Sequence, residues 1–332
     1  MISAVLTVYS ILFYTAEDRL GDALIKLPAI LGLHKIRPDI QLIWVTGSQA
    51  SAFSRALAPL VTTAISEIHE KSRLGIYWRA APHPLRDRHF NCVIVSDKKL
   101  RSAMLLRALP HDRFIAPAAN FFFSDKKPLR PFEQSVSEQT RVLFELAIDQ
   151  PVKLELELPI PLRERELAAR ILPAGKEYVG LAPGAGGCEK CWPLERYIEI
   201  ALAQTAQNRI PVFFLGPMES FWRRTIMDRV PAARFPEYTF EGTSLGGPLL
   251  TIALAARLTV AVANDAGAGH LLAAGGRPLI SLFGNTNPVK FEPPYNKRTV
   301  IRASEFGSTQ VSAIPVGVVM QAIDTLCAHC DD

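Results

Sequence analysis

The chain has 332 residues, of which 48% are hydrophobic and 21% charged, and its formal net charge is +5. This length favours two domains, and the composition is that of a globular protein, which excludes disordered and fibrous classes. The apolar segment 2–14 is too short to span a bilayer and lacks the flanks of a signal peptide. We therefore expect a cytoplasmic protein in which this segment is a buried strand.

Strands and helices alternate through the first half of the chain. We expect strands at 10–15, 41–45 and 91–95, and helices at 51–60, 98–109 and 133–148. This alternation predicts an α/β fold in which a parallel sheet carries helices on both faces. The proline-rich segment 149–161 is typical of a linker. We therefore expect one domain over residues 1–150 and a second over 151–332, with the last helix free to pack back on the first.

Gly21 and Asp22 stand between the first strand and the helical run 23–30. Pro28 is expected to kink or end that helix. Asp is a preferred N-cap residue, so Asp22 is a candidate cap. The same position, held by a tight glycine turn, also suits a general base. The local sequence leaves both roles open.

The positive charge is concentrated in the first half of the chain. Residues 1–150 contain 19 Lys and Arg against 14 Asp and Glu, whereas the remainder contains 18 of each. Between residues 71 and 113, ten basic residues stand against three acidic ones. This segment is either a solvated basic face or a surface for an anionic partner, such as phosphorylated lipid or a membrane. It lacks the interleaved aromatics of a single-strand binder, so nucleic acid is not the expected partner.

Four of the five cysteines form two C-x-x-C pairs, at Cys188/Cys191 and Cys327/Cys330. The pairs are much farther apart than those of a zinc ribbon. A metal site would require all four thiolates to converge in space. We expect neither a metal site nor disulfides.

The second half repeats the alternation. Strands are expected at 178–182, 210–215 and 277–283, and helices at 163–172, 194–203, 249–257 and 314–327. A glycine-rich loop spans 183–193, and residues 216–219 lead from a strand into a further helix. A strand ending at Ala263 is followed by Asn264 and Asp265, by a turn opened by Gly267 and Gly269, and by a helix from His270. This arrangement suits a phosphate cradle, because free N–H groups and the helix dipole favour an anion there. An ordinary strand-to-helix turn has the same pattern.

Other well-known chemical motifs are absent from the sequence. Residues 184–189 fail the G-x-G-x-x-G pattern at its last position, and no G-x-x-x-x-G-K-[ST], G-x-S-x-G or H-E-x-x-H occurs. No Asp-x-Asp stands at a strand end to hold a divalent metal. We expect no cofactor.

Three blocks together resemble a known family. Residues 21–29 (GDALIKLPA) are similar to G-D-x-x-x-x-x-P-A, and 183–193 to P-G-A…K-x-W-P. Residues 264–271 with 282–288 are similar to D-T-G-x-x-H-L…L-F-G-x-T-x-P. In this order they resemble glycosyltransferase family 9, the heptosyltransferases of bacterial lipopolysaccharide synthesis, over nearly the full length. The resemblance implies a GT-B fold, with two Rossmann-like domains facing a cleft.

The resemblance also implies a function. The C-terminal domain would bind a nucleotide-sugar, often ADP-heptose, and the N-terminal domain an anionic lipid A–core glycan at the inner face of the inner membrane. Transfer would invert the anomeric carbon without a metal. Asp22 matches the family's base, and Glu219 matches an acid that holds the ribose, although Glu219 also suits a first helical turn. Lys190 would neutralise the leaving diphosphate.

The expected donor contacts are Pro183, Gly184, Lys190, Glu219, Asp265, Ala266, Gly267, His270 and Thr286. The expected acceptor contacts are Arg19, Lys26, Arg79, Arg86 and Arg88. His270 either touches the diphosphate or packs at the helix start, and Trp192 is expected to be a packing anchor rather than a platform for the base.

Three departures from the family pattern stand out. Ala266 replaces a Thr, Gly269 is expected to loosen the cradle, and Arg19 and Leu20 precede Gly21 in place of small hydroxyl residues. The leading hypothesis remains an inverting glycosyltransferase. The alternatives are a sugar-nucleotide epimerase of the same fold and a non-catalytic donor-binding or scaffold protein.

Overall fold

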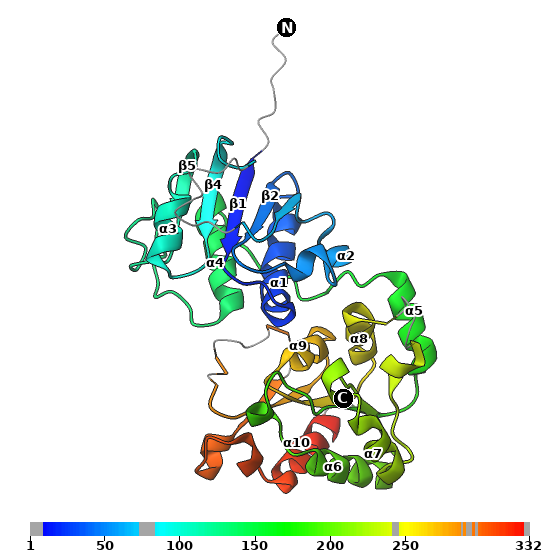
Figure 1. Cartoon of the computed structure of the whole chain (residues 1–332). Helices are drawn as coiled ribbons and strands as arrows, with labels where there is room; N and C mark the ends of the chain where they lie inside the picture. The colour runs from blue at the N-terminus through cyan, green and yellow to red at the C-terminus, as the bar shows by residue number, and fades with distance from the viewer. Residues whose placement is uncertain are drawn as a thin grey trace. The chain divides into compact units, whose positions relative to one another are not determined.

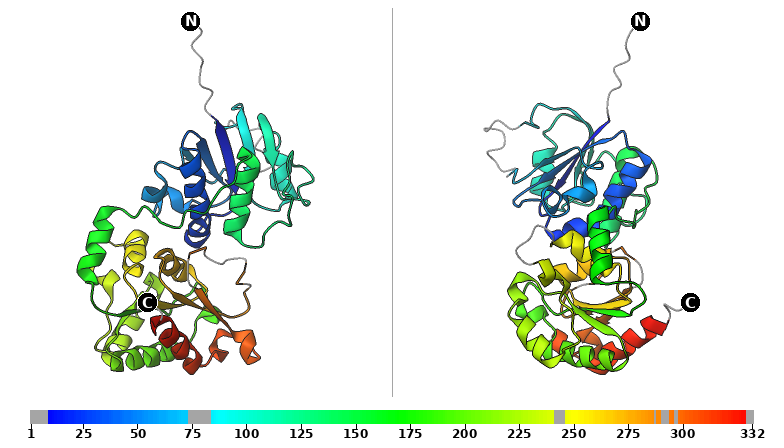
Figure 2. Two further views of the ribbon diagram at one scale, coloured as in Figure 1. Left: turned by 180° about the vertical axis from the view of Figure 1, so that it is seen from behind. Right: turned by 90° about the vertical axis from the view of Figure 1, so that its right-hand side faces the viewer.

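The computed structural model describes residues 9–72, 84–240, 246–286, 288–289, 294–295 and 298–328. The chain divides into two compact units, Met1–Glu155 and Leu156–Asp332. Each unit contains a five-stranded sheet, and every strand pairing is parallel (Figure 1). Helices lie on both faces of each sheet (Figure 2). The predicted α/β class is therefore confirmed.

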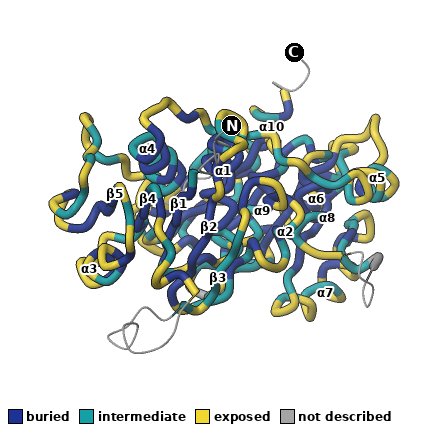
Figure 3. Tube along the Cα trace, turned by 90° about the horizontal axis from the view of Figure 1, so that it is seen from above, coloured by how far each residue is buried: buried dark blue, intermediate teal, exposed yellow. Residues whose placement is uncertain are grey.

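The sheet of the first unit has the order β3-β2-β1-β4-β5. Its elements are β1 (Ser10–Thr15), α1 (Leu20–Ile36), β2 (Gln41–Thr46), η1 (Ala52–Ser54), α2 (Ala58–Val61), β3 (Glu67–His69), β4 (Phe90–Val95), α3 (Leu100–Leu106), β5 (His111–Ile115) and α4 (Val136–Ile148). The central strand β1 is buried along its whole length (Figure 3). The centroid of its Phe13 ring lies 5.3 Å from that of the Phe144 ring on α4. Leu12 packs on the opposite face, in a cluster that includes Leu106 of α3.

Two helix predictions in this unit need correction. The helix expected at 51–60 is a short 3₁₀ segment followed by a single helical turn, α2, with Pro59 in that first turn. Proline has no N–H to donate, which disfavours a helix that would carry Pro59 in its interior. Conversely, α1 does not end at Pro28 but continues to Ile36. The Pro28 carbonyl accepts a 2.9 Å hydrogen bond from the Glu155 amide, which keeps residues up to 155 with the first unit.

The sheet of the second unit has the order β10-β9-β8-β6-β7. Its elements are α5 (Leu162–Ile171), β6 (Tyr178–Ala182), η3 (Cys188–Lys190), α6 (Leu194–Ala206), β7 (Ile210–Phe213), η4 (Pro217–Glu219), α7 (Trp222–Arg229), η5 (Pro236–Phe240), α8 (Pro248–Ala255), β8 (Val260–Asn264), α9 (Gly267–Ala274), β9 (Leu279–Phe283), β10 (Arg298–Arg302), η6 (Ala303–Phe306), η7 (Val311–Ala313) and α10 (Val316–Ala328). The last helix, α10, buries Val319 and Ile323 in the core of this unit. Within the described ranges, no helix is long and apolar enough to cross a membrane.

Candidate active site

Asp22 lies in the first turn of α1, where the chain leaves the carboxyl end of β1. The N-cap position belongs to Arg19, which makes no side-chain cap hydrogen bond, so of the two roles left open for Asp22 the cap role is not observed. Its carboxylate is partly buried and, within the part of the chain that the structure describes, accepts no hydrogen bond. Burial raises its pKa, and nearby Asp18 and Glu17 raise it further, while Lys26 and Arg19 oppose the rise. A partly buried carboxylate with unoccupied oxygens and a raised pKa has the properties of a general base.

A buried ion pair lies beside Asp22. The Lys26 Nζ donates to Asp18 Oδ1 at 3.1 Å, to the Thr15 hydroxyl at 2.9 Å and to the Glu17 carbonyl at 3.2 Å. Asp18 is completely buried. An ammonium group has three N–H bonds, so Lys26 has none left for a ligand. The expectation that Lys26 contacts the acceptor conflicts with this geometry.

The other oxygen of Asp18 is also fully engaged. Asp18 Oδ2 accepts from the indole of Trp44 at 3.0 Å and from the hydroxyl of Ser51. Sequence patterns do not single out Asp18, because an acid between Glu17 and Arg19 looks like part of a solvated turn. Its partners are remote in sequence and become visible only when β2 lies beside β1.

Of the remaining predicted acceptor residues, Arg19 lies near Asp22, whereas Arg86 and Arg88 do not. Arg19 is exposed at the start of α1, and its side chain donates to Gln49 at 3.3 Å. Arg86 and Arg88 precede the amino end of β4, whereas Asp22 follows the carboxyl end of β1. Because β1 and β4 are parallel neighbours, the two arginines and Asp22 lie at opposite ends of the strands. Arg88 is paired with Glu67 at 2.7 Å. Arg79 lies outside the described residues.

In the second unit, predicted donor residues converge at the carboxyl ends of the strands. Asp265 follows β8 and accepts a 2.6 Å hydrogen bond from the Thr286 hydroxyl, which follows β9. The Lys190 Nζ, at the end of the glycine-rich loop, lies 3.9 Å from the Asp265 carboxylate. Lys190 remains substantially exposed. An exposed cation beside a hydrogen-bonded carboxylate and a helix start can serve an incoming diphosphate.

Asn264 fixes the glycine-rich loop to the sheet. Its Nδ2 donates to the Pro183 carbonyl at 2.7 Å, and its Oδ1 accepts from the Trp192 amide and the Tyr197 hydroxyl, both at 3.1 Å. Trp192 itself is fully buried, and its indole donates to the Ile314 carbonyl at 3.0 Å. The predicted packing role of Trp192 is therefore confirmed. The sequence motif includes Asn264, but its partners could not be inferred from a local pattern.

Helix α9 begins at Gly267 rather than at the predicted His270, so both glycines lie in its first turn. Ala266 is the N-cap residue, in an extended conformation, and its methyl side chain offers no acceptor to the first-turn amides. Gly269 does not act as a loose position: a Cβ there would lie 2.9 Å from the Asn264 carbonyl, closer than real side chains come. The glycine therefore allows α9 to pack tightly on the end of β8.

Glu219 lies against the glycine-rich loop. A Cβ on Gly184 would fall 2.6 Å from the Glu219 Cδ, and a Cβ on Gly216 would fall 2.6 Å from Oε2. These two glycines thus make room for the carboxylate beside Pro183 and Gly184. The geometry favours a ligand role for Glu219 over a helix-dipole role, because Glu219 lies in a short 3₁₀ segment that ends before α7 begins.

His270 and Arg298 line a small cavity beside Asp265. Burial and the nearby Arg298 together lower the pKa of His270 to about 4, against an opposing effect of Asp265. The imidazole is therefore neutral at pH 7, and its buried Nδ1 has no hydrogen-bond partner among the described residues. Arg298 donates to the Ser281 hydroxyl at 3.1 Å and lies over the Phe283 ring. Sequence patterns miss Arg298 because the strand that carries it, β10, has only one buried residue.

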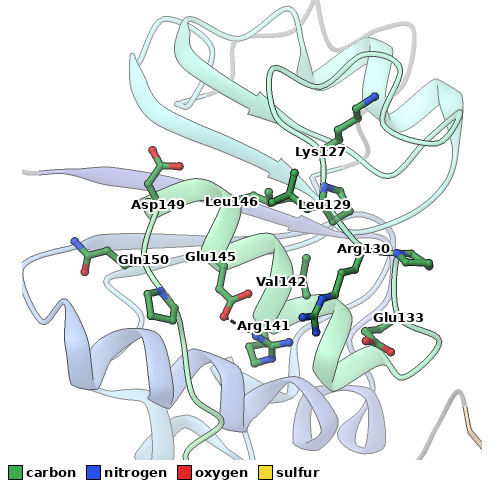
Figure 4. Close-up of a pocket in the computed structure, with 13 residues that line it drawn as sticks. Lys127, Leu129, Arg130, Glu133, Arg141, Val142, Glu145, Leu146, Asp149 and Gln150 are labelled. Atoms are coloured by element: carbon green, nitrogen blue, oxygen red, sulfur yellow. Dashed lines mark hydrogen bonds and ion pairs between the residues drawn. The ribbon is translucent and has the colours of Figure 1, made fainter.

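A larger pocket of about 500 Å³ lies elsewhere in the first unit, between the loop 127–133 and α4 (Figure 4). Its lining contains none of the predicted site residues. The ion pair between Arg141 and Glu145 faces it. Among the described residues, no cluster of His, Cys, Asp and Glu could hold a metal ion. The side chain of Cys188 and the whole of Cys330 lie outside that part, so the interpretation of the two C-x-x-C pairs stays a prediction.

Comparisons with known proteins agree with the motifs. Residues 78–313 match the sequence profile of glycosyltransferase family 9 (heptosyltransferase). The chain is 30% identical over 309 residues to lipopolysaccharide heptosyltransferase 1 of Pseudomonas aeruginosa, covering 86% of this chain and 82% of the relative.

Two solved structures show the same fold. A family 9 glycosyltransferase from Veillonella parvula has a TM-score of 0.70 at 19% identity, covering 97% of this chain and 98% of that one. The Escherichia coli heptosyltransferase WaaC with ADP-2-deoxy-2-fluoro heptose has a TM-score of 0.66 at 20% identity, covering 95% and 99%. The predicted GT-B fold is thus confirmed.

Proposed function

The chain belongs to glycosyltransferase family 9, and from this premise we propose that it transfers heptose from ADP-heptose to an anionic lipopolysaccharide-core acceptor, with inversion and without a metal ion. It is a glycosyltransferase, and its heptosyltransferase relatives support a role in lipopolysaccharide core synthesis. The choice of donor is supported by the ADP-heptose analogue bound to a structure of the same fold.

Asp22 carries the proposal. In an inverting transfer, a base removes the proton of the acceptor hydroxyl while its oxygen attacks the anomeric carbon and the diphosphate departs. The Asp22 carboxylate accepts no hydrogen bond from the residues that the structure describes, and its raised pKa moves its proton affinity toward that of a base working near neutral pH.

The second unit supplies what the leaving group needs. The departing diphosphate gains negative charge, which the Lys190 ammonium and the uncapped amides of α9 can stabilise. Glu219, held against Gly184, is positioned to accept hydrogen bonds from a ribose. The placement of the candidate base in the first unit, and of Lys190 and Glu219 in the second, supports the proposal that the donor binds the second unit and the acceptor the first. It also predicts that chelating agents leave the activity unchanged.

The test is the variant Asp22→Asn, with Asp39→Asn as a matched control, because Asp39 is exposed and pairs only locally with Arg37. Loss of the base should reduce transfer to a lipopolysaccharide-core extract by at least about a hundredfold. ADP should still raise the melting temperature of Asp22→Asn as it does that of the wild type. Unchanged turnover of Asp22→Asn would refute the assignment of the base.

A further inference from the structure

Exposed apolar side chains cluster at one end of the first unit. Among its large hydrophobic residues, Leu100 is 48% exposed, Met104 61%, Phe122 79% and Leu129 fully exposed. Leu100 and Met104 are four residues apart on α3, so they share one face of that helix. Phe122 and Leu129 lie on the loop 119–133, which follows β5. Helix α3 lies at the β5 end of the sheet, on the outside of the unit (Figures 1 and 3).

Helix α3 and this loop lie side by side. Lys98, just before α3, lies over the ring of Phe132 at 5.8 Å. Arg107, just after α3, donates to the Phe123 carbonyl and lies 3.7 Å from Asp125. The rings of Phe122 and Phe123 are in contact, with centroids 5.1 Å apart. Both ends of the helix are therefore tied to the loop, and together they form one surface, which we call the α3 surface.

The α3 surface is positively charged. Residues 97–133 contain eight basic and four acidic residues, a net charge of +4. The exposed basic residues are Lys98, Lys99, Arg101, Arg107, Lys127 and Arg130. Asp97 is engaged by the Ser102 hydroxyl at 2.8 Å, and Asp125 by the Phe114 amide at 2.7 Å. Lys127, Leu129 and Arg130 also line the pocket of Figure 4, together with Arg141 and three acidic residues, Glu133, Glu145 and Asp149.

We propose that the α3 surface docks the enzyme on a membrane that contains anionic phospholipid. Basic side chains attract anionic headgroups, while exposed Leu, Met and Phe side chains enter the headgroup–acyl boundary. Neither signal alone gives firm attachment, and this surface combines both. A protruding, fully exposed leucine among lysines and arginines suits a soft lipid surface better than a complementary protein face.

The topology links docking to the chemistry. Helix α3 begins just beyond the carboxyl end of β4, which pairs with β1, and Asp22 follows the carboxyl end of β1. Docking by the α3 surface therefore holds the carboxyl ends of the strands, where Asp22 lies, near the membrane. This consequence, unlike the docking itself, rests on the proposed function, because it requires a lipid-linked acceptor.

The test is co-sedimentation of the full chain with phosphatidylcholine vesicles, with or without phosphatidylglycerol. The wild type should bind the anionic vesicles at least tenfold more tightly than the neutral ones, and high salt should weaken this binding. The double variant Met104→Glu/Phe122→Glu should lose at least tenfold in affinity. Leu162→Glu/Leu202→Glu is the matched control, because it changes two exposed leucines of the second unit.

The docking proposal would be overturned by no binding of the wild type, by equal binding of Met104→Glu/Phe122→Glu, or by an equal loss in the control. Self-association abolished by the same variant, without vesicle binding, would identify a second copy of the chain as the occupant and also overturn it. Turnover of a deacylated acceptor should be unchanged in the double variant. Failure of docking is thereby distinguished from failure of the catalytic assignment.

Discussion

Replacing Lys26 with Met should move the pH dependence of transfer in a direction fixed by the buried ion pair. Lys26 lies one helical turn beyond Asp22, where side chains are about 6 Å apart. Two unit charges at this distance attract by about 3 kcal/mol at an effective dielectric constant of about 20. This corresponds to about two pH units, and solvent screening at the partly exposed Asp22 reduces it to about one.

The sign follows from the base being active only when ionised. Without the Lys26 charge, the pKa of Asp22 rises further, so the acid limb of kcat/KM moves to higher pH by about one unit. Asp18→Asn should do the opposite, because it removes a carboxylate that raises the pKa of Asp22 and releases the Lys26 ammonium toward it. In the double variant both charges are gone, and the limb should lie between those of the single variants.

The assay is the pH profile of kcat/KM for the wild type and the three variants. Each single variant leaves a buried charge without its partner, which costs about 3–5 kcal/mol of stability, so unfolding must be followed alongside. The double variant should recover much of that loss. If both single variants lower the melting temperature but leave the acid limb unmoved, or move it the same way, the ion pair is only structural.

Three further predictions concern the second unit. The pKa of His270 falls on folding from 6.5 to about 4, so the free energy of unfolding should decrease by up to about 3 kcal/mol as the pH drops from 6.5 to 4. His270→Gln should remove this part of the pH dependence, measured by denaturant unfolding. Ala266→Thr should supply an N-cap side chain and stabilise α9 by about 1 kcal/mol, which raises the melting temperature by about 2–4 °C. An unchanged melting temperature would contradict the capping geometry. Asn264→Ala should leave three buried polar groups unsatisfied, which lowers the free energy of unfolding by about 3 kcal/mol or more. It should also weaken ADP binding, measured by calorimetry, and retained affinity would show that other contacts hold the loop.

Much of the fold could be predicted because most of the strands are short apolar runs. Strands β1, β6 and β8 are buried throughout, and their sequences show it. The strands β3, β5 and β10 could not be found this way, since they lie at the edges of their sheets and carry charged or partly exposed residues. Which residues form strands at a sheet edge depends on the neighbour that completes the hydrogen bonding.

The candidate site was predictable where motifs follow strand ends. The carboxyl ends of parallel strands share one edge, which brings Asp265, Thr286 and Lys190 together from remote segments. Charge alone was a poor guide to the acceptor contacts. Arg88 belongs to the basic segment, yet it is paired with Glu67, at the opposite end of the strands from Asp22. Lys26 looked like a free cation, and only its three acceptors show that it is not.

The anchoring of the glycine-rich loop has a consequence for the energetics of ligand capture. The Asn264 amide joins one end of the loop to the other, and the Trp192 indole ties its far end to the segment before α10. A loop held at both ends in this way loses its backbone entropy when the protein folds rather than when the donor arrives. The exposed Lys190 side chain is still to be ordered, but association should otherwise resemble docking to a preformed surface, with little heat-capacity change beyond that of the ligand's own burial.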